Sequence, residues 1–88
     1  PQDETIITRE CHIMQGTIDV SLAAFECKIG INIAGGTHHS FSYKGEGFCL
    51  LNDMAIATNY LLNHKLTKKI LIVDLDVHQG NGTAEIFE

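Results

Sequence analysis

The chain has 88 residues, 44 % of them hydrophobic, and a formal net charge of −5 at pH 7. This composition is too apolar and too weakly charged for an intrinsically disordered chain, and the length suits one small domain over residues 1–88. The six Lys and Arg residues are scattered, which argues against nucleic-acid binding, and no apolar run approaches the roughly 20 residues of a membrane span.

The three cysteines are Cys11, Cys27 and Cys49. Their number is odd and no two of them form a C-x-x-C pair, so a disulfide framework and a zinc finger are both disfavoured. Reduced thiols are typical of cytoplasmic proteins, and we therefore expect a cytoplasmic location.

The first half of the chain predicts a helix followed by a strand. Apolar residues recur at helical spacing from about residue 9 to residue 28, and Gly30 is placed well just beyond the end of this helix. Residues 29–34 then form a short apolar run that two glycines terminate, which predicts a strand. The following segment, THHSFSYKGEGF, has no period and is expected to be a loop.

The second half repeats this order. Asn52 or Asp53 can cap a helix that runs to about residue 63. Residues 68–76 predict a strand, and its apolar centre indicates a position covered on both faces. Another helix is expected to start at Thr83.

Helices that alternate with strands predict the α/β class, here a parallel sheet with flanking helices. In open sheets of this class, ligands bind outside the carboxyl ends of the strands. Both polar clusters of the chain follow the carboxyl ends of predicted strands, so we expect them to form one functional site.

The first cluster is in ILIVDLDVHQGNG, residues 70–82. Side chains alternate along a strand, so Asp74, Asp76 and His78 start from a common face. A carboxylate and an imidazole two residues apart can both reach one zinc ion, which makes Asp76 and His78 candidate ligands. Asp74 lies deeper and is expected to orient another side chain or to bind an alkali ion. The alternative is a surface loop with a helix cap, although an unpaired charge after a buried run is costly.

The second cluster is GGTHHS, with His38 and His39 after paired glycines. Adjacent imidazoles tend to point apart, which suits one that a carboxylate orients and one that acts as general base. Asp74 and Asn81 are the candidate orienting partners. Two solvated loop histidines are the alternative. A calcium loop starting at Asp74 is disfavoured, because Gln79 occupies the position where an EF-hand needs glycine.

Two long blocks, GGTHHSFSYKGEGFCLLNDMAIA and ILIVDLDVHQGNGTAEIF, resemble the signature blocks of the histone deacetylase superfamily. The two blocks are most similar to those of its class IV-like and bacterial acetoin-utilisation-like members, and the resemblance covers roughly residues 30–87. It implies the arginase–deacetylase α/β fold and a zinc-dependent amidohydrolase. Such an enzyme removes acetyl groups from an N-acetyl-lysine peptide or from a related small acylated amine.

The resemblance also implies roles for individual residues. Asp76 and His78 would be zinc ligands, and His39 would be the general base that activates the zinc-bound water. His38 would be the electrostatic partner of His39, and Asp74 would hold His38 in place.

Three further positions enter through the same resemblance. Asn81 stands where many members have an aspartate that partners the second histidine. Gly47 and Phe48 match the loop that lines the acyl-lysine tunnel, with the Gly47 carbonyl facing the substrate amide. Asp74, together with the two zinc ligands, would contribute to a structural K⁺ site, largely through backbone carbonyls.

The related ureohydrolases share this fold but use D-x-H-x-D to bridge two manganese ions. Gly80 stands here in place of the last aspartate of that motif, which favours one zinc ion.

The family's third zinc ligand and its oxyanion-donating tyrosine are expected in a later segment. We therefore expect the chain to be the central fragment of one catalytic domain, inactive by itself. Open strand edges and bare helix faces should make it self-associate. The alternative is a non-catalytic binding or structural module that retains the fold.

Overall fold

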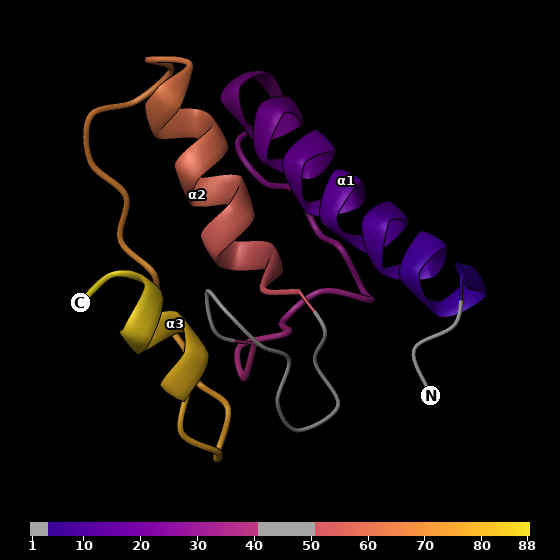
Figure 1. Ribbon diagram of the computed structural model, residues 1–88. Coiled ribbons are helices and arrows are strands. Elements are labelled where there is room, and N and C mark those ends of the chain that lie inside the picture. Colours follow the sequence, from indigo (N-terminus) through magenta and orange to yellow (C-terminus); the bar gives the residue numbers. More distant parts are fainter. Residues whose placement is uncertain (1–3, 41–50) are drawn as a thin grey trace.

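The computed structural model describes residues 4–40 and 51–88, and these form three helices. They are α1 (Glu4–Cys27), α2 (Asp53–Asn63) and α3 (Asn81–Ile86). Helix α2 contacts both α1 and α3, so it is the central element of the structure (Figure 1). The chain that follows α2 runs along the side of α2 that faces away from α1 (Figure 1).

Helix α1 begins earlier than its sequence pattern predicts and ends close to the expected position. Lys28, with φ 77°, leaves the helix in the left-handed region, so the residue that ends the helix is not Gly30. Gly16 does not interrupt the helix. Its missing side chain leaves room for Asn32, whose Nδ2 would lie 3.1 Å from a Cβ at this position. Asn32 uses this access to donate a hydrogen bond to the Ile13 carbonyl at 3.0 Å.

Helix α2 begins where the sequence predicts. Asn52 is its N-cap, and its side-chain oxygen accepts a hydrogen bond from the Ala55 N–H at 3.1 Å. The buried apolar side chains of the described residues come only from α1 and α2, and they are few: Ile13, Met14, Ala55 and Ala57. Buried polar groups therefore carry an unusually large part of the packing between these helices and the loops.

The predicted α/β fold with a parallel sheet is wrong for the described part of the chain. Residues 4–40 and 51–88 contain helices and irregular segments but no strand, and this includes both predicted strands, 29–34 and 68–76. A strand requires a neighbouring strand to complete its backbone hydrogen bonds. Within the described residues, no backbone hydrogen bond joins these two segments to each other.

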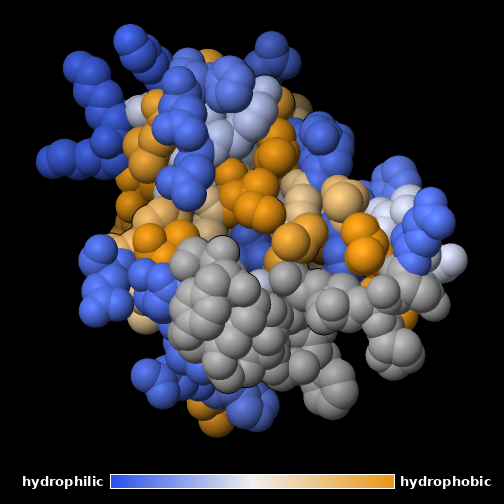
Figure 2. Space-filling view, viewed as in Figure 1, coloured by the Kyte–Doolittle hydropathy of each residue, from blue (hydrophilic) through white to orange (hydrophobic). Residues whose placement is uncertain are grey.

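The two segments nevertheless expose apolar side chains at alternate positions. Their odd-numbered apolar residues point into solvent, up to 98 % exposed at Ile33 and 91 % at Leu75. Figure 2 shows apolar side chains gathered across the middle of one face of the molecule. Apolar periodicity is thus present in both segments, but the partner strands are not. Among the described residues, no helix has the length and apolar character needed to cross a membrane.

Candidate active site

The candidate site lies where three segments meet: residues 35–40, which carry both histidines of the GGTHHS cluster and are called the histidine loop below, the chain around residues 74–78, and the start of α3. Thr83 in the first turn of α3 donates its backbone N–H to the His38 carbonyl at 3.2 Å. This hydrogen bond ties the two polar clusters together, although they are about 40 residues apart in the sequence. The structure therefore brings both clusters to one place without a sheet.

His38 is the buried imidazole of the site, with 5 % of its surface exposed. Its Nδ1 lies 2.5 Å from Asp74 Oδ2. An ionised carboxylate only accepts hydrogen bonds, so Nδ1 carries the proton and donates it to Asp74. The hydrogen bond from His38, followed by one from the Asp76 N–H, lowers the pKa of Asp74 below its usual value. The orienting carboxylate of His38 is therefore ionised near neutral pH.

His39 contacts Asn81 rather than a carboxylate. His39 Nδ1 lies 2.8 Å from Asn81 Oδ1, which also accepts the Gly82 N–H at 3.1 Å. Because a backbone N–H only donates, the shared Asn81 atom is an acceptor, and His39 Nδ1 must carry a proton. The lone pair of a neutral His39 is then on Nε2, which is the form that a general base requires.

Asp76 and His78 face each other on the exposed side of the site. Asp76 Oδ1 lies 3.0 Å from His78 Nδ1 and also accepts the His78 N–H at 2.7 Å. These bonds, first the one from the backbone and then the one from the ring, lower the pKa of Asp76. The His39 and His78 ring centroids are 6.2 Å apart, so the predicted base and the predicted ligand are neighbours.

A carboxylate and an imidazole are donors that zinc prefers, and this pair fits two positions of a zinc site. A catalytic zinc takes three protein ligands. In residues 4–40 and 51–88, no group of three His, Cys, Asp or Glu side chains is arranged to hold a metal ion. His38 Nε2 lies 3.7 Å from Asp76 Oδ1, while its Nδ1 donates to Asp74. Asp76 and His78 therefore remain predicted zinc ligands, and the described residues do not supply a third ligand beside them.

Residues at the start of α2 bind the histidine loop both before and after its two histidines. Beyond its role as N-cap, Asn52 donates from Nδ2 to the Ser40 carbonyl at 3.2 Å and to Thr83 Oγ1 at 2.9 Å. Asp53 accepts hydrogen bonds from the backbone N–H groups of Gly36 and Thr37. Asn52 and Asp53 are only 4 % and 2 % exposed. Sequence analysis identified both only as possible helix caps, because nothing in the local pattern indicates which distant loop they contact.

The comparisons with known proteins bear on the same residues. The chain matches the family model for the Histone deacetylase domain over residues 2–88. The chain belongs to the histone deacetylase family. Over all 88 residues it is 49 % identical to an uncharacterized protein of Picosynechococcus sp., and it spans 29 % of that protein's length. It is 42 % identical over 74 residues to Histone deacetylase 9 of Arabidopsis thaliana, with 82 % of this chain and 17 % of that protein covered.

A third relative, Histone deacetylase 6 of Caenorhabditis elegans, is 48 % identical over 50 residues, which cover 57 % of this chain and 5 % of that protein. No solved structure matches the chain significantly. These relatives confirm the deacetylase family, but they do not confirm the class IV-like subtype that the sequence suggested. Because the chain spans less than a third of the cyanobacterial relative, the activity of the whole protein is a matter for proposal.

Two glycines of this deacetylase-family chain lie against the site, a role that the sequence pattern alone does not indicate. A Cβ on Gly80 would lie 2.6 Å from Asp74 Oδ2 and 3.3 Å from His38 Nδ1. A Cβ on Gly82 would lie 2.3 Å from the Ser40 carbonyl oxygen. The close approach of α3 to the histidine loop therefore requires glycine at position 82, where the crowded atoms are backbone, whereas a Cβ at position 80 would displace the Asp74 side chain. The glycines of QGNG are visible in the sequence, but the atoms they approach are not.

The remaining predicted residues stay predictions. Gly47 and Phe48 lie outside the described residues. A cavity of about 910 Å³ between α2, α3 and the connecting chain has Asp74, Asp76 and His78 among its lining residues. The predicted metal ligands are therefore accessible from this cavity.

Proposed function

We propose that the protein containing this chain is a zinc-dependent deacetylase. Its reaction would be hydrolysis of the amide bond of an acetylated lysine peptide or of a small acylated amine. The observation that carries this proposal is the paired arrangement of the two histidines, His38 on Asp74 and His39 on Asn81, directly beside Asp76 and His78. Membership of the deacetylase family supports the same reaction.

Each described residue has a defined task in this proposal. Asp76 and His78 hold the metal, and a third ligand comes from outside the described residues. His39 accepts the proton of the attacking water at Nε2, because its Nδ1 proton is engaged by Asn81. His38 stays oriented by Asp74 and provides a polar wall beside the reacting groups. When bound, a zinc ion polarises the amide carbonyl and lowers the pKa of its water.

The finer features of the proposal come from the family resemblance. Gly47 and Phe48 would line the channel for the acyl-lysine, and Asp74 would contribute to a K⁺ site. We also propose that the protein is cytoplasmic and that it does not bind nucleic acid directly.

Zinc binding can be measured on this chain by titration calorimetry. Because only two ligands are present, we expect weak binding that Asp76→Ala and His78→Ala both abolish. Asp19→Ala and His12→Ala are matched controls, since both residues are exposed and outside the site. Binding that survives both site substitutions, or that the controls weaken equally, would show that the ligands are misassigned.

Deacetylation is tested in the whole protein with an acetyl-lysine peptide. His39→Ala should remove nearly all turnover, and a chelator should do the same reversibly. A protein that is folded and binds zinc but has no turnover with any acylated amine would favour the non-catalytic module instead.

A further inference from the structure

Asp53 is a buried carboxylate that the proposed reaction does not use. It is 2 % exposed and lies at the first residue of α2, where a negative charge is favourable. Its two oxygens accept hydrogen bonds from two neighbouring N–H groups of the histidine loop, Thr37 at 2.9 Å and Gly36 at 3.0 and 3.1 Å. Two consecutive N–H groups that converge on one anion form a concave binding geometry.

The backbone of the loop is shaped to fit this carboxylate. Gly36 has φ 89°, a left-handed conformation that favours glycine. A Cβ on Gly35 would lie only 2.4 Å from Asp53 Oδ2. Thr37 closes the contact in both directions, because its Oγ1 donates to Asp53 Oδ1 at 3.1 Å and accepts the Asp53 N–H at 3.0 Å. The loop is therefore fitted around the carboxylate immediately before His38.

A second side of the same carboxylate is held by α1. Thr17 Oγ1 donates to Asp53 Oδ2 at 2.7 Å and accepts from Asn32 Nδ2 at 2.8 Å. The bonds from Thr17 stabilise the packing of α1 against α2, whereas the bonds from Gly36 and Thr37 set the path of the loop. These two groups of bonds can be removed separately, which makes the role of Asp53 testable.

We propose that Asp53 is a positioning residue for His38 and His39. The carboxylate fixes residues 36 and 37, and thereby sets where the next two side chains meet Asp74 and Asn81. This inference rests on the proposed function for its catalytic meaning. A displacement of about 1 Å in a catalytic group can lower the rate about 100-fold. We therefore expect Asp53→Asn to lower kcat of the whole protein by up to about 100-fold with little change in KM.

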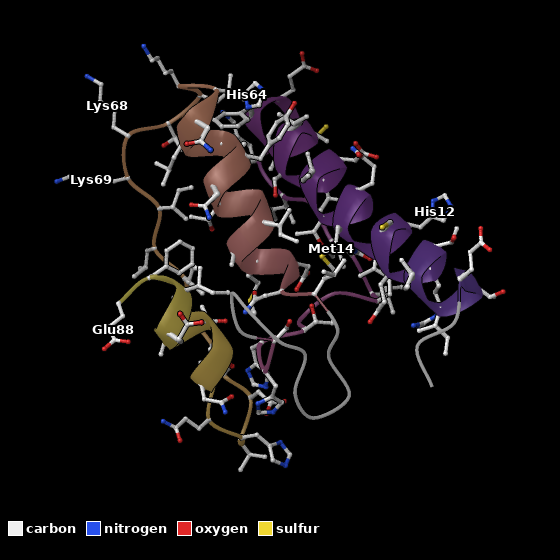
Figure 3. The ribbon with its side chains drawn as sticks, viewed as in Figure 1. His12, Met14, His64, Lys68, Lys69 and Glu88 are labelled. Atoms are coloured by element: carbon white, nitrogen blue, oxygen red, sulfur yellow. The ribbon has the colours of Figure 1, made fainter. Side chains whose placement is uncertain are left out.

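The decisive measurement is the long-range imidazole ¹H–¹⁵N NMR spectrum, which detects the ring nitrogens through carbon-bound protons and therefore reports on buried and exposed histidines without metal or activity. His38 Nδ1–H is buried against Asp74, which protects its signal from exchange with water. His64 and His12 are internal references. Figure 3 shows His64 at the far end of α2 from Asp53 and His12 on the outer side of α1.

Three variants separate positioning from stability. Asp53→Asn and Thr37→Val weaken the contact with the loop, so they should shift or broaden the His38 and His39 signals and leave the references in place. Thr17→Val removes the α1 side together with the hydrogen bond from Asn32, so it should lower stability and move the histidine signals less than Thr37→Val does. Asp19→Asn, at an exposed aspartate, controls for the change of charge.

The proposal is wrong if the His38 and His39 signals stay in place in a folded Asp53→Asn protein, or if Thr17→Val moves them as much as Thr37→Val does. If Asp53→Asn does not fold, as changes at His64 would reveal, Thr37→Val alone decides. Signals that respond as expected in a protein without deacetylase turnover would refute the proposed reaction but not the role of Asp53.

Discussion

The stability of the site should depend on Asn52 in two separable ways. Its side-chain oxygen caps α2, and its Nδ2 group bonds to Ser40 and Thr83 on two other segments. Replacing a helix N-cap by alanine costs about 1 kcal/mol. Each of the two donated hydrogen bonds contributes about 1 kcal/mol net. We therefore expect Asn52→Ala to lower the free energy of unfolding by about 3 kcal/mol.

Asn52→Ser tests this division. A serine hydroxyl is a good N-cap but is too short to reach Ser40 or Thr83, so this variant should lose about 2 kcal/mol. Domains are stabilised by roughly 0.05–0.15 kcal/mol per residue, about 4–13 kcal/mol for 88 residues, so either loss is a large share of the total.

The assay is urea unfolding followed by far-ultraviolet circular dichroism, with the m-value as a check that the transition has not changed in kind. If Asn52→Ser is as stable as the unmodified chain, the bonds to Ser40 and Thr83 contribute nothing, and Asn52 is only a helix cap. Equal losses in the Ser and Ala variants would show instead that the cap contributes nothing. Either result would refute the division of roles read from the structure.

Acid should weaken the fold through Asp53. Burial raises the pKa of this carboxyl, but the hydrogen bonds from Thr17, Thr37 and Gly36 outweigh burial, so the pKa is lowered from 3.8. The contribution of this carboxyl to the free energy of unfolding is complete above its pKa in the unfolded chain and is lost as the pH falls through its pKa in the folded chain. Between about pH 5 and pH 3, urea titrations should therefore show a larger fall in the free energy of unfolding for the unmodified chain than for Asp53→Asn. Gly80→Ala should displace the Asp74 side chain and thereby remove the His38 Nδ1–H NMR signal. The free energy of unfolding should fall by only about 1 kcal/mol, since the crowded atom belongs to a movable side chain. An unchanged His38 signal would contradict this contact. The chain should self-associate as its concentration rises, measured by light scattering, because large apolar side chains are exposed at Ile29, Ile31, Ile33, Leu71, Val73, Leu75 and Val77; a monomer at all concentrations would contradict this.

The helices were predictable because their signals are local. Apolar spacing indicated the region of α1. Asn52 indicated the start of α2, because the residue that it caps, Ala55, is only three positions further along the chain. The strands were predicted from equally local patterns, and for the described residues that prediction is wrong. A short apolar run indicates only that a segment can form a strand, whereas a strand exists only when another segment completes its backbone hydrogen bonds.

The sequence by itself determined the family and the residue types of the candidate site: two histidines after paired glycines, and a D-x-D-x-H run whose side chains are of the kind that zinc binds. Only the tertiary structure decided which groups meet. Thr17 and Asp53 are 36 positions apart, and Asn52 and Thr83 are 31 positions apart. Whether a buried carboxylate serves a helix cap, a loop or a metal depends on which donors the fold brings within about 3 Å of it, and no local pattern encodes that distance.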